Sequence, residues 1–135
     1  MTTPEDPTPP VPLTPQHLEV GMRAFFRIAA LWQLSEAEQL ALLGITSSSI
    51  LDGLKAGGIA DIGAETIERL GSVFGIFRAI NIIMQHPDRA DAWMRRPNTG
   101  APFAGRSAIE RMTGGDISDL DAVRRYLESV SGRLG

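Results

Sequence analysis

Residues 93–127 read WMRRPNTGAPFAGRSAIERMTGGDISDLDAVRRYL, and they place two short helix signals around a connector rich in proline, asparagine and glycine. The connector keeps Trp93 and Phe103 among turn-forming residues, at spacings that no simple amphipathic helix produces. A loop of this composition either folds back onto its own helices or presents a surface to a partner. The sequence leaves both alternatives open.

The composition excludes several classes of protein. The 135 residues, 43% of them hydrophobic, are enough for one compact unit with a core, or for two very small ones. A net charge of −3 argues against a general polyanion binder, although a local basic face is compatible with it. The chain has no cysteine, only two histidines and no acidic cluster at ligand spacing, so we expect no disulfide, no metal site and no cofactor. Because there is neither a signal-peptide pattern nor an apolar run near the ~20 residues of a membrane span, we expect a soluble cytoplasmic protein without membrane contact.

The chain begins with a segment that has almost nothing to bury. Residues 1–13, MTTPEDPTPPVPL, contain five prolines and two acids, which predicts a disordered or extended arm. Thr14 as N-cap and Pro15 at the first helical position then predict a helix over about residues 15–32. The apolar residues of this helix recur at helical spacing: Leu18, Met22, Phe25, Phe26, Ala29 and Trp32.

Two short helices separated by a glycine turn follow, and this is the outline of a helix-turn-helix. Ser35 and Glu38 form a capping box for the first helix, which Gly44 ends. Thr46 is the expected cap of the second helix, which ends at residues 57–58. The pair predicts a helix-turn-helix-like region, although any small helical bundle contains such pairs.

A long helix is predicted over about residues 64–85, and its apolar arc is unusually wide. The arc takes in both the 67/70/74/77 row and the 73/76/80/83 row, which is more than one intramolecular contact needs. Either this is the central helix of the fold or it also forms a dimer interface, for which Phe74, Phe77 and Ile80 are the candidates.

The C-terminal part carries three further helix starts. Pro87 opens a short helix through Trp93, and Ser107 with Glu110 forms a capping box for a helix of one or two turns. Ser118 begins the last helix. The apolar face of that helix consists of Leu120, Val123, Leu127, Val130 and Leu134. No alternating run predicts a strand, so the expected fold class is all-α, a small helical bundle.

Short motifs in order along the chain resemble the Xre/MbcA/ParS family of bacterial antitoxins. The N-terminal half matches at Trp32-x-Leu34-Ser35, Leu42-Leu43-Gly44-Ile45, Arg69 and Phe74-Gly75-Ile76. The C-terminal half matches at Trp93, Pro97-Asn98, Phe103-x-Gly105-x-Ser107, Met112, Gly115, Leu120 and Val123-Arg124-x-Tyr126-Leu127. The resemblance covers about residues 30–130, and its C-terminal half is the more specific. One mild departure is Ala108-Ile109 after Ser107, where the family usually has Pro-Leu.

The resemblance implies the antitoxin of a type II toxin–antitoxin module, with no catalysis by this chain. Its C-terminal domain is expected to bind a RES-domain toxin and to cover the NAD site of that toxin, and the chain is expected to form a homodimer that represses its own operon. The implied division is an arm over residues 1–13, a helix-turn-helix-like region over 14–62, and a long helix plus the toxin-binding domain over 63–135. The candidate toxin-binding residues are Trp93, Asn98, Phe103, Arg106, Arg124, Arg125, Arg133, Leu134 and Gly135.

The expected recognition helix is a poor match for DNA. The stretch TSSSILDGLKAG offers Lys55 as its only cation, and the charges over residues 35–57 sum to −2. Phosphate attraction requires Lys or Arg near the backbone, so we expect weak binding to operator DNA by the isolated protein. Ser47, Ser48 and Ser49 either contact phosphates or base edges or merely cap a helix. A free-standing helix-turn-helix regulator and a small helical adaptor remain the alternatives.

Enzyme chemistry has little support in the sequence. Asp116, Asp119 and Asp121 lack the glycine and the terminal glutamate of a calcium loop, and a helix start explains them better. His86 before Pro87 fits a cap region. The two Gly-Gly pairs lack the lysine that follows a phosphate-binding loop.

Arginine is the main electrostatic feature of the C-terminal part. The set consists of Arg95, Arg96, Arg106, Arg111, Arg124, Arg125 and Arg133. These arginines form either a solvated face or, together with nearby aromatic residues, a partner-binding face. Gly132 is expected to stop the last helix, so that residues 133–135 leave it as a short extension. Either the terminal carboxylate mimics a phosphate in the NAD pocket while Arg133 pairs with an acid of the toxin, or these residues are a frayed terminus.

Overall fold

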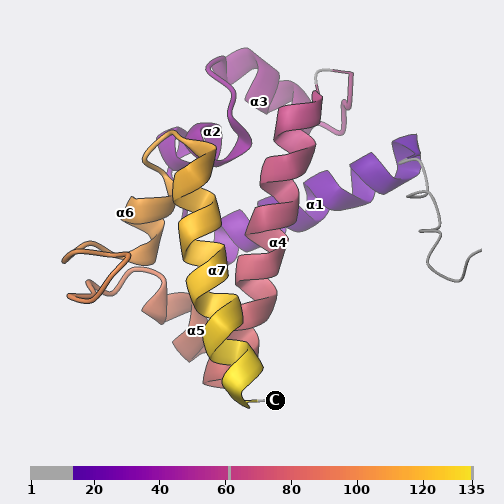
Figure 1. The fold of residues 1–135 in the computed structure, drawn as a ribbon. Coiled ribbons are helices and arrows are strands. Elements are labelled where there is room, and N and C mark those ends of the chain that lie inside the picture. The colour runs from indigo at the N-terminus through magenta and orange to yellow at the C-terminus, as the bar shows by residue number, and fades with distance from the viewer. Residues whose placement is uncertain (1–13, 61, 135) are drawn as a thin grey trace, which may run out of the picture.

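The computed structural model describes residues 14–60 and 62–134, and within these ranges the chain forms seven helices and no strand. The all-α expectation is therefore confirmed. The helices are α1 (Pro15–Leu31), α2 (Glu36–Leu43), α3 (Ser48–Lys55), α4 (Ala64–Met84), α5 (Pro87–Trp93), α6 (Ala108–Met112) and α7 (Ile117–Leu134) (Figure 1). The arm expected over residues 1–13 lies outside the described residues.

Three helix starts that the sequence predicts are confirmed by their capping hydrogen bonds. The hydroxyls of Thr14, Ser35 and Ser107 each accept from the backbone N–H three residues later, at 3.1–3.2 Å. In each case the third residue's side chain accepts the cap's own backbone N–H, which completes a capping box. In α1 this third residue is His17, a role that the sequence pattern did not indicate.

Two other helix starts differ from the prediction by one residue. The cap of α3 is Ser47 rather than Thr46, because it is the Ser47 hydroxyl that accepts from the third backbone N–H of the helix, at 3.4 Å. Helix α7 begins at Ile117 rather than at Ser118. There the Asp116 carboxylate accepts from the Ser118 backbone N–H at 3.1 Å, so the aspartate takes the role expected of the serine.

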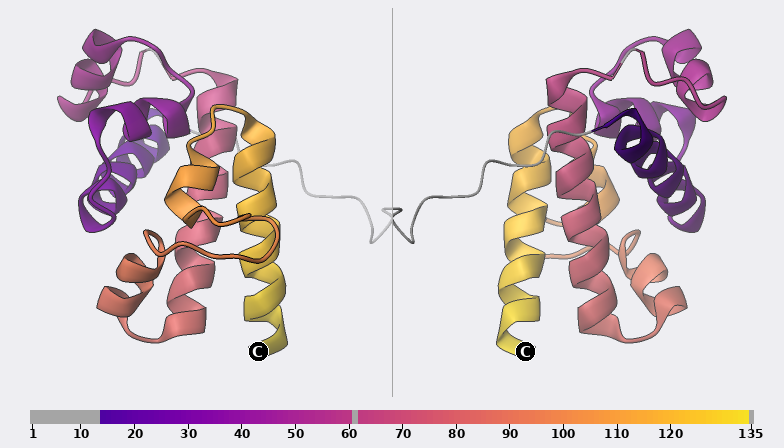
Figure 2. Two further views of the ribbon diagram at one scale, coloured as in Figure 1. Left: turned by 90° about the vertical axis from the view of Figure 1, so that its left-hand side faces the viewer. Right: turned by 90° about the vertical axis from the view of Figure 1, so that its right-hand side faces the viewer.

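Helix α4 is the centre of the fold. It packs most extensively along α7, which lies beside it and runs in the same direction, and it also contacts α1, α2 and α5 (Figures 1 and 2). Gly75 permits this close packing, because a Cβ there would lie 3.2 Å from the Glu128 carboxylate and 3.4 Å from the Arg124 side chain. The largest fully buried side chains are Trp32, Phe25, Phe103, Leu42, Leu43, Leu51, Ile76, Ile80, Met94, Ile109, Met112 and Leu120.

Buried polar side chains of α4 attach the end of α2 to the rest of the molecule. The Thr66 hydroxyl donates to the Leu43 carbonyl at 2.8 Å. The buried Arg69 guanidinium donates to the Ala41 carbonyl and to the Gly115 carbonyl, each at 3.1 Å. Arg69 thereby joins the last turn of α2 to the loop before α7.

The end of α7 corrects one expectation. Gly132 does not stop the helix, which continues to Leu134, and the Arg133 side chain donates to the Ser129 carbonyl at 3.4 Å along the same helix. A glycine ends a helix when its backbone takes a left-handed conformation, whereas Gly132 keeps the helical one. The predicted extension of residues 133–135 is therefore wrong for Arg133 and Leu134, and Gly135 lies outside the described residues.

Candidate functional site

Three aromatic rings form a continuous cluster between the end of α5, the following loop and α7. The Phe103 ring makes edge-to-face contacts with Trp93 at 5.7 Å and with Tyr126 at 5.2 Å between ring centroids. Phe103 is buried, whereas Trp93 is half-buried and Tyr126 is 38% exposed. Phe103 therefore anchors the loop on its own helices, and a partner can reach only the outer two rings.

The loop that carries Phe103 is closed at its base by backbone hydrogen bonds. The Asn98 N–H donates to the Arg106 carbonyl at 3.1 Å, and the Gly105 N–H donates to the Asn98 carbonyl at 2.6 Å. Gly105 has a φ of 90°, a conformation that favours glycine. The Asn98 side chain donates to the Arg96 carbonyl at 2.9 Å, so this candidate toxin-binding residue helps to shape the loop.

Arg111 of α6 holds the loop and α7 together. Its guanidinium donates to the Pro102 carbonyl at 3.0 Å and forms an ion pair with Asp119. Figure 2 places this loop alongside α7, with α6 between the loop and the top of that helix. Of the arginines in this part of the chain, Arg111 therefore has a structural role, and its side chain is only 21% exposed.

Other arginines of this region are directed to the surface. Arg106 at the loop base and Arg133 at the end of α7 are both exposed. Arg125 is 80% exposed and pairs with Asp121 one turn earlier, at 2.9 Å. Because residues seven apart share one face of a helix, Tyr126 and Arg133 lie on the same face of α7. We call Trp93, Arg106, Tyr126 and Arg133 the aromatic–arginine face.

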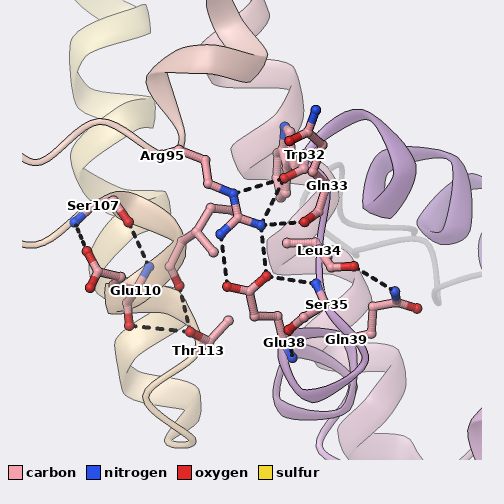
Figure 3. Close-up of polar contacts among 11 residues, drawn as sticks. Trp32, Gln33, Leu34, Ser35, Glu38, Gln39, Arg95, Ser107, Glu110 and Thr113 are labelled. Atoms are coloured by element: carbon pink, nitrogen blue, oxygen red, sulfur yellow. Dashed lines mark hydrogen bonds and ion pairs between the residues drawn. The ribbon is translucent and has the colours of Figure 1, made fainter.

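Arg95 connects this region to the turn between α1 and α2 (Figure 3). Its guanidinium donates to the Trp32 carbonyl at 3.1 and 3.2 Å, to the Gln33 carbonyl at 2.6 Å, and to both carboxylate oxygens of Glu38. The hydrogen bond from Arg95 lowers the pKa of Glu38, and the same contact raises the pKa of Arg95. The sequence places Arg95 only in the set of C-terminal arginines. No local pattern links it to Glu38, because the two residues are far apart in the chain.

The comparison with known proteins agrees with this arrangement. Residues 78–133, from the second half of α4 through most of α7, match the family described as "Antitoxin Xre/MbcA/ParS C-terminal toxin-binding domain". The chain is also 41% identical over 112 residues to "Uncharacterized protein y4oB" of Sinorhizobium fredii, covering 82% of this chain and 84% of that protein. The chain belongs to the Xre/MbcA/ParS antitoxin family. The resemblance inferred from the motifs is confirmed over residues 78–133, which match the toxin-binding domain of the family.

The whole aromatic–arginine face lies inside the toxin-binding domain. Asn98, Phe103 and Arg124 also lie inside this domain. Phe103 is buried and offers no surface to a partner. Arg124 is half-exposed and pairs with Glu128 at 3.3 Å. Leu134 is 62% exposed and follows the matched segment directly. The composition of this surface, which combines exposed arginines with the accessible edges of Trp93 and Tyr126, is typical of protein interfaces.

The candidate DNA-binding residues lie at the other end of the molecule, on α3. The Ser47 and Ser49 hydroxyls share a hydrogen bond of 2.8 Å at the helix start, while Ser48 is exposed. The Lys55 ammonium lies over the Phe26 ring, 5.9 Å from its centroid. At least Ser47 thus has the capping role that was the alternative to DNA contact.

The candidate dimer residues differ in their exposure. Phe74 and Phe77 are half-buried, and the Phe77 ring packs against Trp32 at 6.0 Å between centroids. Ile80 is 1% exposed in the core, so this residue offers no surface to a second copy. A wide apolar arc on α4 is largely explained by its central position, because neighbouring helices cover it on several sides.

Two other kinds of site concern metal ions and membranes. Within residues 14–60 and 62–134 no group of three or more His, Asp or Glu side chains is placed to hold a metal ion. No helix in the same ranges is long and apolar enough to cross a bilayer.

Proposed function

We propose that this antitoxin neutralises a RES-domain toxin by binding it through the aromatic–arginine face and covering its NAD site. The observation that carries the proposal is the exposure of Tyr126, Arg106 and Arg133, with the half-buried Trp93, on the segment that matches the toxin-binding domain. Arginine and large aromatic residues are enriched among the residues that dominate binding energy in interfaces. Neutralisation of this kind needs no chemistry by the antitoxin itself, and it would take place in the cytoplasm, with the toxin.

The end of α7 is the element best suited to enter a pocket. Arg133 and Leu134 lie in its last turn, both exposed, and the guanidinium is available for a carboxylate of the toxin. A helical end replaces the extended tail expected from the sequence. A rigid helix loses less conformational entropy on binding than a flexible tail would, which favours affinity.

Co-expression with a RES-domain toxin encoded beside this antitoxin tests the proposal. The pair should co-purify, bacterial growth should recover, and NAD consumption by the purified toxin should stop at an excess of antitoxin. Reversing the charge of Arg106 and Arg133 together, both to Glu, should weaken inhibition. The matched control reverses Arg23 and Arg27, two exposed arginines of α1 outside the toxin-binding domain.

Two outcomes would contradict different parts of this proposal. If NAD consumption continues at excess antitoxin and no complex forms, the RES-domain partner is wrong. If the complex forms but both charge-reversed proteins inhibit equally well, binding uses a surface other than the aromatic–arginine face.

A second function, repression of its own operon by a homodimer, is favoured by one observation. Helices α2 and α3 are short, lie next to each other in the chain, and are joined by a turn at Gly44, whose φ of 71° is left-handed. Two short helices joined by such a turn are compatible with a helix-turn-helix, and this supports the second function. The acidic balance of residues 35–57 opposes strong DNA binding by a single copy, so a dimer or the toxin complex would have to supply further cations.

A further inference from the structure

A groove of about 720 Å³ lies between α1 and the end of α3, away from the aromatic–arginine face. Its apolar lining includes Met22, Phe26, Leu34 and Leu54, and its charged lining residues are Glu19, Arg23 and Lys55, with a net charge of +1. An apolar floor with a positive rim fits an apolar peptide that carries acidic residues.

One buried polar atom in the groove has no partner among the described residues. Gln39 lines the groove and is only 9% exposed, and its side-chain amide donates to the Leu34 carbonyl at 3.0 Å. The Oε1 atom of the same amide accepts no hydrogen bond. A buried acceptor without a donor is unfavourable, so a peptide N–H that donated to Gln39 would stabilise the occupied groove.

We propose that the groove binds residues 5–13 of the same chain, EDPTPPVPL. This segment contains apolar residues and the two acids Glu5 and Asp6. The negative charges of these acids complement the positive charges of Arg23 and Lys55 in the groove. Proline-rich peptides dock in apolar grooves at a low cost in conformational entropy. Occupancy would also withdraw Lys55, the only cation of α3, from a polyanion.

The length of the segment suits the length of the groove. The groove follows α1 from Glu19 to Gln33, and Thr14 precedes the first turn of that helix. At ~1.5 Å per helical residue, the path from Thr14 to Phe26 is about 18 Å. Eight residues in an extended proline-rich conformation span about 25 Å, at ~3.1 Å each, so the acids can reach past Lys55.

The same chain is a better occupant than a second copy. In a two-fold contact whose axis passes through the groove, the groove would face its own copy, so that Arg23 and Lys55 of both copies would approach one another. The N-terminal segment instead brings two negative charges and is held at a high effective concentration by its attachment to α1.

Paramagnetic labelling of the full-length protein tests the inference directly. Because the chain has no cysteine, Thr8→Cys supplies one unique site for a nitroxide label. Amide signals of Phe26, Lys55 and Gly57 should lose intensity, whereas those of Arg125 and Tyr126 on α7 should not. A loss of signal intensity spread evenly over the surface, or no loss at the groove residues, would overturn the proposal. A second sample mixes chains that carry only the nitroxide with chains that carry only the isotope label. Loss of the groove signals in this mixture would also overturn the proposal, because the segment would then bind the groove of a second copy.

A charge reversal separates specific docking from non-specific proximity. Lys55→Glu should restore the groove signals, and adding Glu5→Lys and Asp6→Lys to that variant should bring the signal loss back. Arg27→Glu is the matched control, because Arg27 is an exposed cation of α1 that does not line the groove. The proposal is wrong if Arg27→Glu and Lys55→Glu have the same effect. Since this test reads only the N-terminal segment, its failure leaves the proposed toxin neutralisation untouched.

Discussion

Arg95 and Glu38, which are 57 positions apart in the chain, form a two-pronged ion pair with nitrogen–oxygen distances of 2.9 and 2.8 Å. The same guanidinium also satisfies the carbonyls of Trp32 and Gln33 at the end of α1. This contact fixes the start of the loop that carries Phe103 to the turn between α1 and α2. It therefore couples the N-terminal helices to the toxin-binding domain of this antitoxin.

Arg95→Ala should destabilise the protein by about 1–3 kcal/mol, because it removes the donor to two backbone carbonyls and the cation paired with Glu38. Urea unfolding followed by circular dichroism measures the change. Arg125→Ala is the control: the Arg125–Asp121 pair is exposed, and such pairs contribute ~0.2–1 kcal/mol or less. Equal losses for the two variants would show that the Arg95 contact has no special role.

The Arg95–Glu38 pair should also make stability depend on pH. The hydrogen bond from Arg95 lowers the folded-state pKa of Glu38 below its ordinary value of 4.5, so its contribution is complete above that value and is lost as the pH falls through the folded-state pKa. The free energy of unfolding of the native protein minus that of Glu38→Gln should therefore be largest near neutral pH and shrink below pH 4.5. Burial raises the pKa of Asp91, an effect of opposite sign that both proteins share and that cancels in the difference. A difference that stays constant from neutral pH to pH 3 would contradict this assignment.

Two glycine-to-alanine substitutions should change the free energy of unfolding in opposite directions. Gly44 has a φ of 71°, and a Cβ there would lie 2.6 Å from the Nε atom of Arg69, so Gly44→Ala should destabilise by roughly 1–3 kcal/mol. Gly71 is exposed within α4, and a Cβ there would meet nothing within 4 Å, so Gly71→Ala should stabilise by about 0.5–1 kcal/mol. Thermal unfolding of the two variants checks both signs, and a stable Gly44→Ala would mean that Arg69 can move aside without loss.

Leu134→Asp should weaken toxin inhibition without a loss of stability, because the side chain is 62% exposed at the end of α7. Full burial of a leucine side chain in an interface is worth about 1.5–3 kcal/mol, whereas substitutions at exposed positions usually change stability by less than about 0.5 kcal/mol. Titration of RES-toxin NAD consumption gives the inhibition constant. Val20→Asp on α1, at a side chain 57% exposed, is the matched control. Unchanged inhibition by Leu134→Asp would place the occluding element elsewhere, in the first instance at the Phe103 loop.

The isolated antitoxin should bind its own promoter only weakly, and Lys55→Ala should change this binding little. The reason is the net charge of −2 over residues 35–57, combined with the position of the Lys55 ammonium over the Phe26 ring. Fluorescence anisotropy with labelled promoter DNA measures the affinity. A dissociation constant near ~10⁻⁸ M at physiological salt for the isolated protein would contradict the expectation, because that value is typical of dedicated repressors.

Local chemistry in the sequence determined the helices and their caps. Ser35 with Glu38 and Ser107 with Glu110 each satisfy hydrogen bonds within four residues, so the pattern alone identifies them. The family resemblance rests on the order of short motifs, so it could also be inferred from the sequence alone. The caps are Ser47 instead of Thr46 and Asp116 instead of Ser118, because neighbouring side chains that can accept a hydrogen bond compete for the capping position.

The tertiary structure decided which residues of the candidate surface are available. The sequence left open whether Phe103 and Arg95 face a partner; in the structure Phe103 is buried between two rings, and Arg95 donates to carbonyls at the end of α1. The path of the chain after Gly132 was likewise settled only in the folded molecule, because a glycine there tolerates both helical and non-helical backbone. Contacts between residues far apart in the chain depend on how α4 brings the two halves of the chain together. No local sequence pattern encodes which of these residues meet.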